Sequence, residues 1–376
     1  MKKQALIVAN LAGFASFLIP SMQILQKFGY EITYAANANK LEWSVTKSKL
    51  DEMGVRFVQI DFDSQKPLSS ENRKAYRQLK ALLKEKQYDL VHCHTPIAGL
   101  LTRLAAKRQR KKGTCVIYTT HGFAFTSRSG KKQKLLYGTL EKFGSRFCDA
   151  IVTINREDYV AAKKMHCKKV YYVNGVGVDT QRFRDAEVDR DTFRAQIGIA
   201  PDRIMVLSVG ELSVRKNHRI IIEAIALLPD KHRYVYVICG NGINGGTGNA
   251  LQTLASERGV DLRLLGFRRD IPQIMKVSDI GAIPSIREGL GLAGVQSLAA
   301  GIPIVGSDVQ GIKDYIVDGK TGYLCNPFDA AAFARAITKL VAEREGMAND
   351  CREVAKAFDI AVAKAQIEAI YTELLG

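Results

Sequence analysis

Short apolar runs alternate with amphipathic stretches along the first half of the chain. Runs of buried-strand character occupy residues 5–10, 31–36, 55–60, 88–94, 115–121, 150–154 and 169–175. Between them, residues 15–28, 71–86, 97–110 and 131–146 repeat their apolar positions at helical spacing. Because strands that alternate with helices form parallel sheets covered on both faces, this half is predicted to be an α/β domain.

The same alternation begins again in the second half. Strands are predicted at 203–210 and near 234–239, 262–265, 280–283 and 303–305. A helix is predicted from Leu292 to Ala300, because Gly301 ends it and Pro303 prevents a restart. The polar stretch 176–191 between the two series is the best candidate for a linker. The chain therefore reads as two α/β domains.

Length and composition agree with two globular domains, but the charge is unevenly distributed. The 376 residues are 47% hydrophobic and 25% charged. Residues 1–180 carry 31 Lys and Arg against 14 Asp and Glu, whereas residues 181–376 carry 24 of each. The asymmetry indicates an anionic partner for the first domain, a nucleic acid or an acidic membrane surface. The basic runs lack the interleaved aromatic residues of RNA-binding proteins, which argues against nucleic acid.

A membrane surface is the expected partner of the basic half. The runs 103–112 and 128–134 are the most basic, and the first continues the predicted helix 97–110. This pattern suits a helix resting on lipid headgroups, and a solvated helix end is the open alternative. The residues expected on this side are Arg103, Lys107, Arg108, Arg110, Lys111 and Lys112. The first twenty residues imitate a signal peptide with the wrong spacing, so we expect a cytoplasmic protein with peripheral contact.

Cysteine and acidic patterns do not predict a metal site. Seven scattered cysteines without a CxxC pair favour reduced thiols. In His92-Cys93-His94, adjacent side chains on a strand point to opposite faces, and no second ligand cluster is visible. Asp61-Phe62-Asp63 imitates a metal-binding DxD, but it follows a strand of the basic half and is interpreted as an acidic loop.

Three loops of the second half carry candidate chemistry. Residues 208–218, 239–242 and 285–292 each follow a predicted strand, so they can line one crevice at the carboxyl ends of a parallel sheet. Arg215 and Lys216, a glycine turn and the start of a helix suit a nucleotide diphosphate. Glu288 directly precedes that helix start, and an acidic helix cap is the competing interpretation.

The segment PSIREGLGLAGVQSLAAGIPIV (284–305) resembles the pattern PSxxEGxGLxxxEAxAxGxPVV of a known family. That family is the retaining GT-B glycosyltransferases of family four, the group-one polysaccharide glycosyltransferases. The resemblance continues through GIKDYIVDGKTGYLCNP (311–327) and covers nearly the whole chain. In the first half, HCHTPIAGLLTRLAAK (92–107), YTTHGFAF (118–125) and VYYVNGVGVDTQRF (170–183) are similar to the branch that builds bacterial exopolysaccharide and capsule repeat units.

The resemblance implies the GT-B fold, two Rossmann-like domains whose parallel sheets face a central cleft. Residues 1–178 would bind the acceptor and residues 179–359 the nucleotide-sugar donor. A C-terminal helix at residues 360–376 would pack back on the first domain.

The family's site residues can be placed by number. Glu288 matches a glutamate that contacts the donor sugar's hydroxyls, and His121 matches a histidine near the reacting centre; these are the expected catalytic residues. The expected donor-binding residues are Gly13, Arg215, Lys216, Gly240, Arg268, Gly289, Leu290, Gly291, Leu292 and Gln296.

Two positions depart from the family pattern. Gln296 stands where the family has a second glutamate that holds the nucleotide ribose, and an amide lacks charge assistance there. Glu211 follows Gly210 where the family has an arginine, so Arg215 is the candidate replacement from the other end of the loop.

The resemblance also implies a reaction. The enzyme would move a sugar, preferably an N-acetylhexosamine, from UDP to a saccharide on polyprenyl diphosphate at the cytoplasmic leaflet. Retention would proceed by front-side attack, without metal or cofactor. A sugar-nucleotide 2-epimerase and a non-catalytic partner subunit remain alternatives. An NAD-dependent enzyme is disfavoured, since no GxGxxG opens the first βαβ unit.

Overall fold

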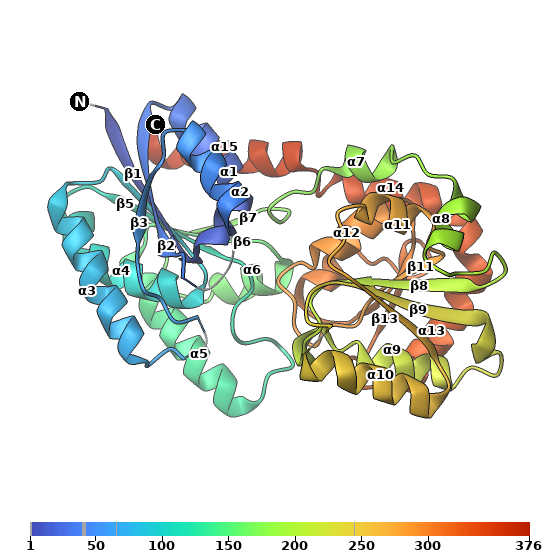
Figure 1. Ribbon diagram of the computed structural model, residues 1–376. Helices are drawn as coiled ribbons and strands as arrows, with labels where there is room; N and C mark the ends of the chain where they lie inside the picture. Colours follow the sequence, from blue (N-terminus) through green and yellow to red (C-terminus); the bar gives the residue numbers. More distant parts are fainter. Residues whose placement is uncertain (1, 40–42, 65, 244) are drawn as a thin grey trace. The chain divides into compact units, whose positions relative to one another are not determined.

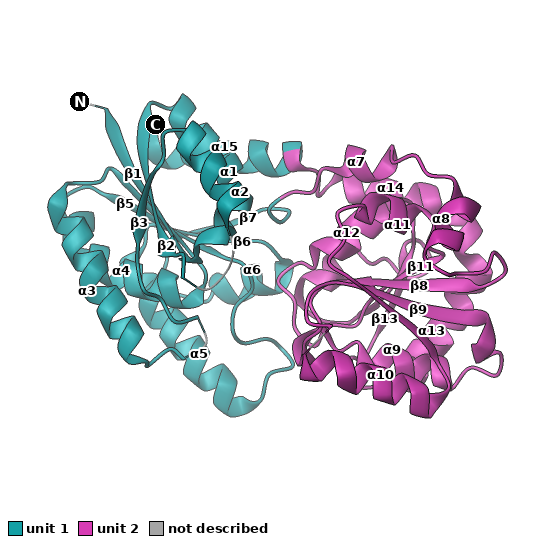
Figure 2. Cartoon of the chain, viewed as in Figure 1, with its two compact units in different colours: residues 1–176, 361–376 teal, residues 177–360 magenta. Residues whose placement is uncertain are grey.

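The computed structural model describes residues 2–39, 43–64, 66–243 and 245–376 and divides into two compact units. Unit 1 comprises Met1–Val176 and Ala361–Gly376, and unit 2 comprises Gly177–Ile360 (Figure 2). Most of the predicted linker belongs to unit 2, where it forms α7 (Thr180–Arg184) and starts α8 (Arg190–Gln196). The polar residues that suggested a linker include helix caps, because Asp179 and Asp189 accept hydrogen bonds from the first turns of α7 and α8.

Unit 1 is built on a seven-stranded parallel sheet in the order β3-β2-β1-β4-β5-β6-β7 (Figure 1). All seven strands predicted for this half are present. Their bounds are β1 Lys3–Leu11, β2 Tyr30–Asn37, β3 Arg56–Gln59, β4 Leu90–His94, β5 Cys115–Thr120, β6 Ala150–Thr153 and β7 Lys169–Tyr172. The central strands β1 and β4 are buried on both faces, which explains their continuous apolar runs.

Helices surround this sheet. They are η1 Ala12–Phe17, α1 Ile19–Lys27, α2 Ser44–Glu52, α3 Ser70–Glu85, α4 Pro96–Arg110, α5 Lys131–Gly144, η2 Ser145–Phe147, α6 Arg156–Ala162 and α15 Ile360–Leu375. The predicted helix 15–28 is divided into η1 and α1. Helix α2 went unpredicted because Leu50 is its only buried residue, so no apolar stripe marks it. Helix α15 joins unit 1, where Tyr371 is fully buried.

Unit 2 has a six-stranded parallel sheet in the order β10-β9-β8-β11-β12-β13. The strands are β8 Ile204–Val209, β9 Tyr234–Cys239, β10 Asp261–Gly266, β11 Ile280–Ile283, β12 Ile304–Ser307 and β13 Gly322–Cys325. The helices are η3 Val214–Lys216, α9 Arg219–Ala226, η4 Lys231–Arg233, α10 Gly246–Arg258, α11 Ile271–Lys276, α12 Leu292–Ala299, η5 Gln310–Asp314, α13 Ala330–Glu343, η6 Arg344–Gly346 and α14 Ala348–Lys356. The strand order reverses at β8, which lies between β9 and β11. Ligands of such sheets bind outside the carboxyl ends of the strands at this switch point.

Gly240 directly follows β9 at this edge of the sheet, where two loops approach closely. Its N–H donates to the carbonyl oxygen of Gly266 at 2.8 Å. A Cβ atom at Gly240 would lie 1.8 Å from the carbonyl oxygen of Gly210. The absence of a side chain therefore lets the loop after β9 pack against the loop after β8.

Replacing Gly240 by Ala should destabilise unit 2, because the added methyl group forces the two loops apart. We expect a loss of about 1–3 kcal/mol in the free energy of unfolding, measured by urea denaturation. Gly246→Ala is the matched control, since a Cβ there meets open space. Equal denaturation midpoints for the two variants would contradict the close packing of these loops.

Candidate active site

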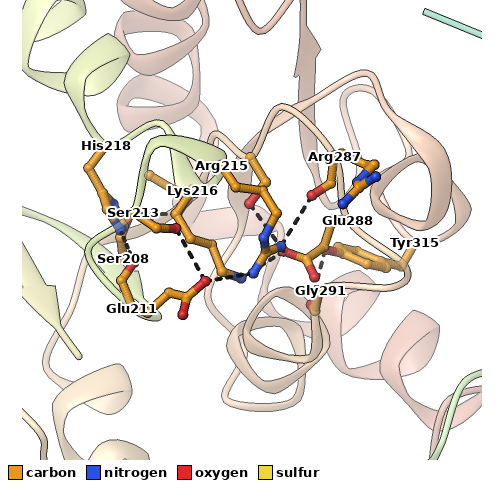
Figure 3. Close-up of polar contacts among 12 residues, drawn as sticks. Ser208, Glu211, Ser213, Arg215, Lys216, His218, Arg287, Glu288, Gly291 and Tyr315 are labelled. Carbon is orange, nitrogen blue, oxygen red and sulfur yellow. Dashed lines mark hydrogen bonds and ion pairs between the residues drawn. The ribbon is translucent and has the colours of Figure 1, made fainter. Parts of the chain in front are cut away.

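Glu288 is the centre of a charged network in unit 2 (Figure 3). Its Oε2 atom accepts hydrogen bonds from Lys216 Nζ at 2.7 Å, Arg215 Nη1 at 3.0 Å and Ser285 Oγ at 3.2 Å. The N-cap residue of α12 is Gly291, so no side chain caps this helix. Glu288 is therefore an ion-pair partner of two cations rather than the helix cap that its position also suggested.

The ionisation of Glu288 is set by its two basic neighbours. Burial favours the neutral acid, and the carboxylate is only 15% exposed. Lys216 and Arg215 outweigh burial and lower the pKa of Glu288. The carboxylate is thus charged at neutral pH, and it holds both cations at the carboxyl end of the sheet.

Arg215 also connects this network to Glu211. Its Nη2 atom donates to Glu211 Oε1 at 3.0 Å, and its Nη1 atom donates to the carbonyl oxygen of Arg287 at 3.2 Å. The carbonyl of Glu211 lies 3.2 Å from Nε2 of His218, which is buried. The formal charges of the two carboxylates and the two cations cancel. Hydrogen bonds to these carboxylates orient both cations before any anionic ligand binds.

Gly291, three residues after Glu288, is required by its backbone conformation and its close packing. Gly291 has φ +79°, which disfavours other residues, and a Cβ there would lie 3.0 Å from the hydroxyl of Tyr315. That hydroxyl donates to the carbonyl oxygen of Gly291 at 3.2 Å. The chain therefore enters α12 tightly beside Glu288. Since the first N–H groups of a helix lack intrahelical acceptors, this entrance can hold an anion.

Two predicted donor residues are not bonded to the network. Arg268 forms an ion pair with Asp270, with its Nη2 atom 2.6 Å from the carboxylate. Gln296 is partly exposed in the middle of α12. Within the described ranges, neither side chain forms a hydrogen bond or ion pair with Glu288, Arg215 or Lys216.

Unit 1 has a separate cluster of its own around His121. His121 directly follows β5, and its Nε2 atom lies 3.2 Å from Nδ1 of His94. The ring of Phe14 packs edge-on against His121 with ring centroids 4.7 Å apart. Because Phe14 neighbours Gly13 in η1, the structure brings the predicted glycine loop beside the predicted histidine. Burial lowers the pKa of His121 to about 4, so the imidazole is neutral.

The sequence interpretation missed the residues that support His121. His92 and His94 lie on the same face of β4, as alternation along a strand requires. His92 Nδ1 lies 2.7 Å from the hydroxyl of Tyr371, a residue of α15. The HxH spacing was the available signal. Among the residues that the structure describes, no group of three His, Cys, Asp or Glu side chains is arranged to hold a metal ion.

Arg103 was predicted to lie on the membrane side, and the burial of its side chain contradicts that prediction. It is fully buried, and its Nη2 atom lies 2.8 Å from Glu141 of α5. It cannot face lipid, because it lies on the inner face of α4. Arg110 is partly exposed and pairs with Asp149 at 2.8 Å. The exposed cations of this region are Lys107, Arg108, Lys111 and Lys112. No helix in the described part of the chain is long and apolar enough to span a membrane.

Comparisons with known proteins show the family of the chain. The family model for glycosyl transferases group 1 matches residues 189–358, and the family model for glycosyltransferase family 4 matches residues 22–182. The chain is 33% identical to EpsD of Bacillus subtilis (strain 168), named as a glycosyltransferase, over 99% of this chain and 97% of that protein. It is 31% identical to an Escherichia coli UDP-Gal:alpha-D-GlcNAc-diphosphoundecaprenol alpha-1,3-galactosyltransferase, over 79% of this chain and 78% of that protein.

The fold is also shared with solved structures. Anabaena Alr3699/HepE in complex with UDP-glucose superposes with a TM-score of 0.78 at 19% identity, covering 99% of this chain and 100% of that chain. The two parallel sheets and this likeness confirm the predicted GT-B fold class. The chain belongs to the group 1 glycosyltransferases of family four.

Proposed function

We propose that this glycosyltransferase moves a sugar, preferably an N-acetylhexosamine, from a UDP-sugar to a saccharide on polyprenyl diphosphate in bacterial exopolysaccharide or capsule synthesis. The observation that carries the proposal is the pairing of Glu288 with Lys216 and Arg215 beside the start of α12. The galactosyltransferase relative is named for a UDP-sugar and a diphosphoundecaprenol acceptor, which supports both substrate classes. HepE, crystallised with UDP-glucose, supports the donor.

The network suits a reaction in which a diphosphate leaves. Lys216, Arg215 and the N–H groups at the start of α12 would stabilise the negative charge that develops on the leaving group. The carboxylate of Glu288 would accept hydrogen bonds from sugar hydroxyls while it keeps both cations in place. Retention would use front-side attack, in which the leaving diphosphate helps to take the acceptor's proton. These fixed cations would make the reaction independent of a metal ion and a cofactor.

The test is a release assay with purified protein. UDP-, GDP- and dTDP-sugars are supplied with and without a bacterial lipid extract, and free nucleotide, labelled lipid and the identity of the remaining nucleotide sugar are measured. We expect release from one UDP-sugar only when lipid is present, unchanged by EDTA. Lipid-independent conversion of a UDP-sugar would instead indicate an epimerase. If no donor is consumed, the proposal is wrong, and Glu211 and Gln296 would mark a degenerate donor site.

We also propose that helix α5 docks the enzyme on the inner face of the cell membrane. Leu135 and Leu136 are 73% and 57% exposed, and Phe143 on the same helix is also exposed. Exposed lysines flank these apolar residues at positions 131, 132, 134 and 142. Apolar side chains bordered by cations are typical of helices that lie in the interface of an anionic membrane.

The double variant Leu135→Ser/Leu136→Ser should bind anionic vesicles about tenfold more weakly, since each inserted leucine contributes about 0.7 kcal/mol or more. Vesicle sedimentation measures this change. Val160→Ser, which alters an exposed apolar residue of α6, is the control. Turnover of a short soluble acceptor should be preserved in both. Vesicle binding that is unchanged in the double variant would exclude α5 as the docking helix.

A further inference from the structure

A basic cavity of about 510 Å³ opens in unit 1 at the amino ends of β5, β6 and β7. Cys115, Asp149 and Lys169 lie in its wall at or next to the first residues of these strands. His121 follows the opposite, carboxyl end of β5. The basic cavity is therefore separate from the histidine cluster of unit 1, and no residue of the Glu288 network lines it.

The basic cavity contains more cations than its carboxylates can neutralise. Of the four permanent cations in its wall, Arg110 pairs with Asp149 at 2.8 Å and Lys169 pairs with Glu373 at 3.1 Å. The other two, Arg146 and Lys168, have no carboxylate partner among the residues described in the structure. Two positive charges thus remain available to an anion.

A neutral histidine lies beside Arg146 in the wall of the basic cavity. The Nη2 atom of Arg146 lies 3.2 Å from Nε2 of His166. A guanidinium can only donate, so Nε2 is the acceptor and the imidazole carries its proton on Nδ1. Partial desolvation, Arg146 and Lys142 lower the pKa of His166, in agreement with the neutral form. An anion beside Arg146 and Lys168 would therefore meet a guanidinium and an ammonium, and the neutral imidazole of His166 lines the same cavity.

We propose that the basic cavity binds a phosphate group, with Arg146 and Lys168 as its main contacts. The guanidinium fork matches two phosphate oxygens, and two cations match the charge of a phosphomonoester. The volume leaves room for the group esterified to the phosphate. The ligand would be an anionic phospholipid headgroup or a soluble phosphate ester. The basic cavity shares no lining residue with the Glu288 network.

The first test follows the ring protons of His166 by NMR during titration with glycerol 3-phosphate, with the signals assigned from His166→Gln. We expect a saturable shift in the full-length protein and in Lys164→Gln, which removes an exposed lysine outside the basic cavity. Arg146→Gln/Lys168→Gln should lose the shift. Signals that do not move, or that move equally in the double variant, would overturn the proposal. The readout is local, so it stays informative even if no sugar donor is ever consumed.

The second test distinguishes the two sources of phosphate. Vesicles of phosphatidylcholine with and without phosphatidic acid are sedimented with each protein. If a headgroup occupies the cavity, the double variant should bind phosphatidic acid vesicles at least tenfold more weakly. Each cation lost is expected to weaken vesicle binding by about fivefold. Equal vesicle binding by all proteins, together with the lost NMR shift, would support a soluble phosphate ester as the ligand.

Discussion

Replacing Glu288 by Gln should lower the transfer rate by about 100- to 1,000-fold while leaving the fold intact. The neutral amide keeps the shape of the side chain and one acceptor oxygen, but it lacks the negative charge that balances Lys216 and Arg215. Both cations would lose the carboxylate that orients them, and the sugar would lose a charged acceptor. The rate is measured with the donor that the release assay identifies, and circular dichroism checks the fold.

Glu211→Gln is the matched control for this prediction. It makes the same chemical change on a carboxylate that also contacts Arg215, at 3.0 Å, but Glu211 is 56% exposed where Glu288 is 15% exposed. Exposed ion pairs contribute little, so we expect a loss of less than about tenfold. If the two variants lose activity equally, Glu288 has no special role in the reaction.

Replacing Arg103 by Met should destabilise unit 1 by about 3–5 kcal/mol. Arg103 is completely buried, donates to the carbonyl oxygen of Gly99 at 3.0 Å and stacks on the ring of Tyr118. Its partner Glu141 is buried as well. Methionine fills much of the space, but among the described residues it leaves the carboxylate of Glu141 with only the hydroxyl of Tyr118, at 3.0 Å. Urea denaturation followed by circular dichroism measures the loss.

Two further variants separate the ion pair from a general effect of mutation. Arg108→Gln removes an exposed arginine of the same helix and should change stability by less than about 0.5 kcal/mol. Arg103→Met/Glu141→Leu removes both charges, and it should be more stable than Arg103→Met because no unpaired carboxylate remains buried. If the double variant is no more stable than the single one, the loss comes from packing rather than charge.

The charge of α4 illustrates where sequence reasoning reached its limit. In the run 103–112, the sequence does not distinguish a buried cation from an exposed one among Arg103, Lys107 and Arg108. Periodicity places each of them on a helix, but it does not reveal which of them has a buried partner elsewhere in the chain. Glu141 is 38 residues away on α5. The burial of Arg103 depends on this long-range pair, whereas its neighbours Lys107 and Arg108 are exposed, as basic residues on a helix usually are.

The sequence by itself determined the alternation of strands and helices, the two parallel α/β domains and the family, since apolar periodicity and glycine spacing are local properties. It also determined that Glu288, Arg215 and Lys216 belong to loops at one edge of a sheet. The tertiary structure alone decided that Glu288 binds both cations instead of capping α12, and that Tyr371 of α15 meets His92 of β4. These contacts join residues 72, 73 and 279 positions apart. Only the packing of complete elements brings such residues together, so no local pattern can encode the contact.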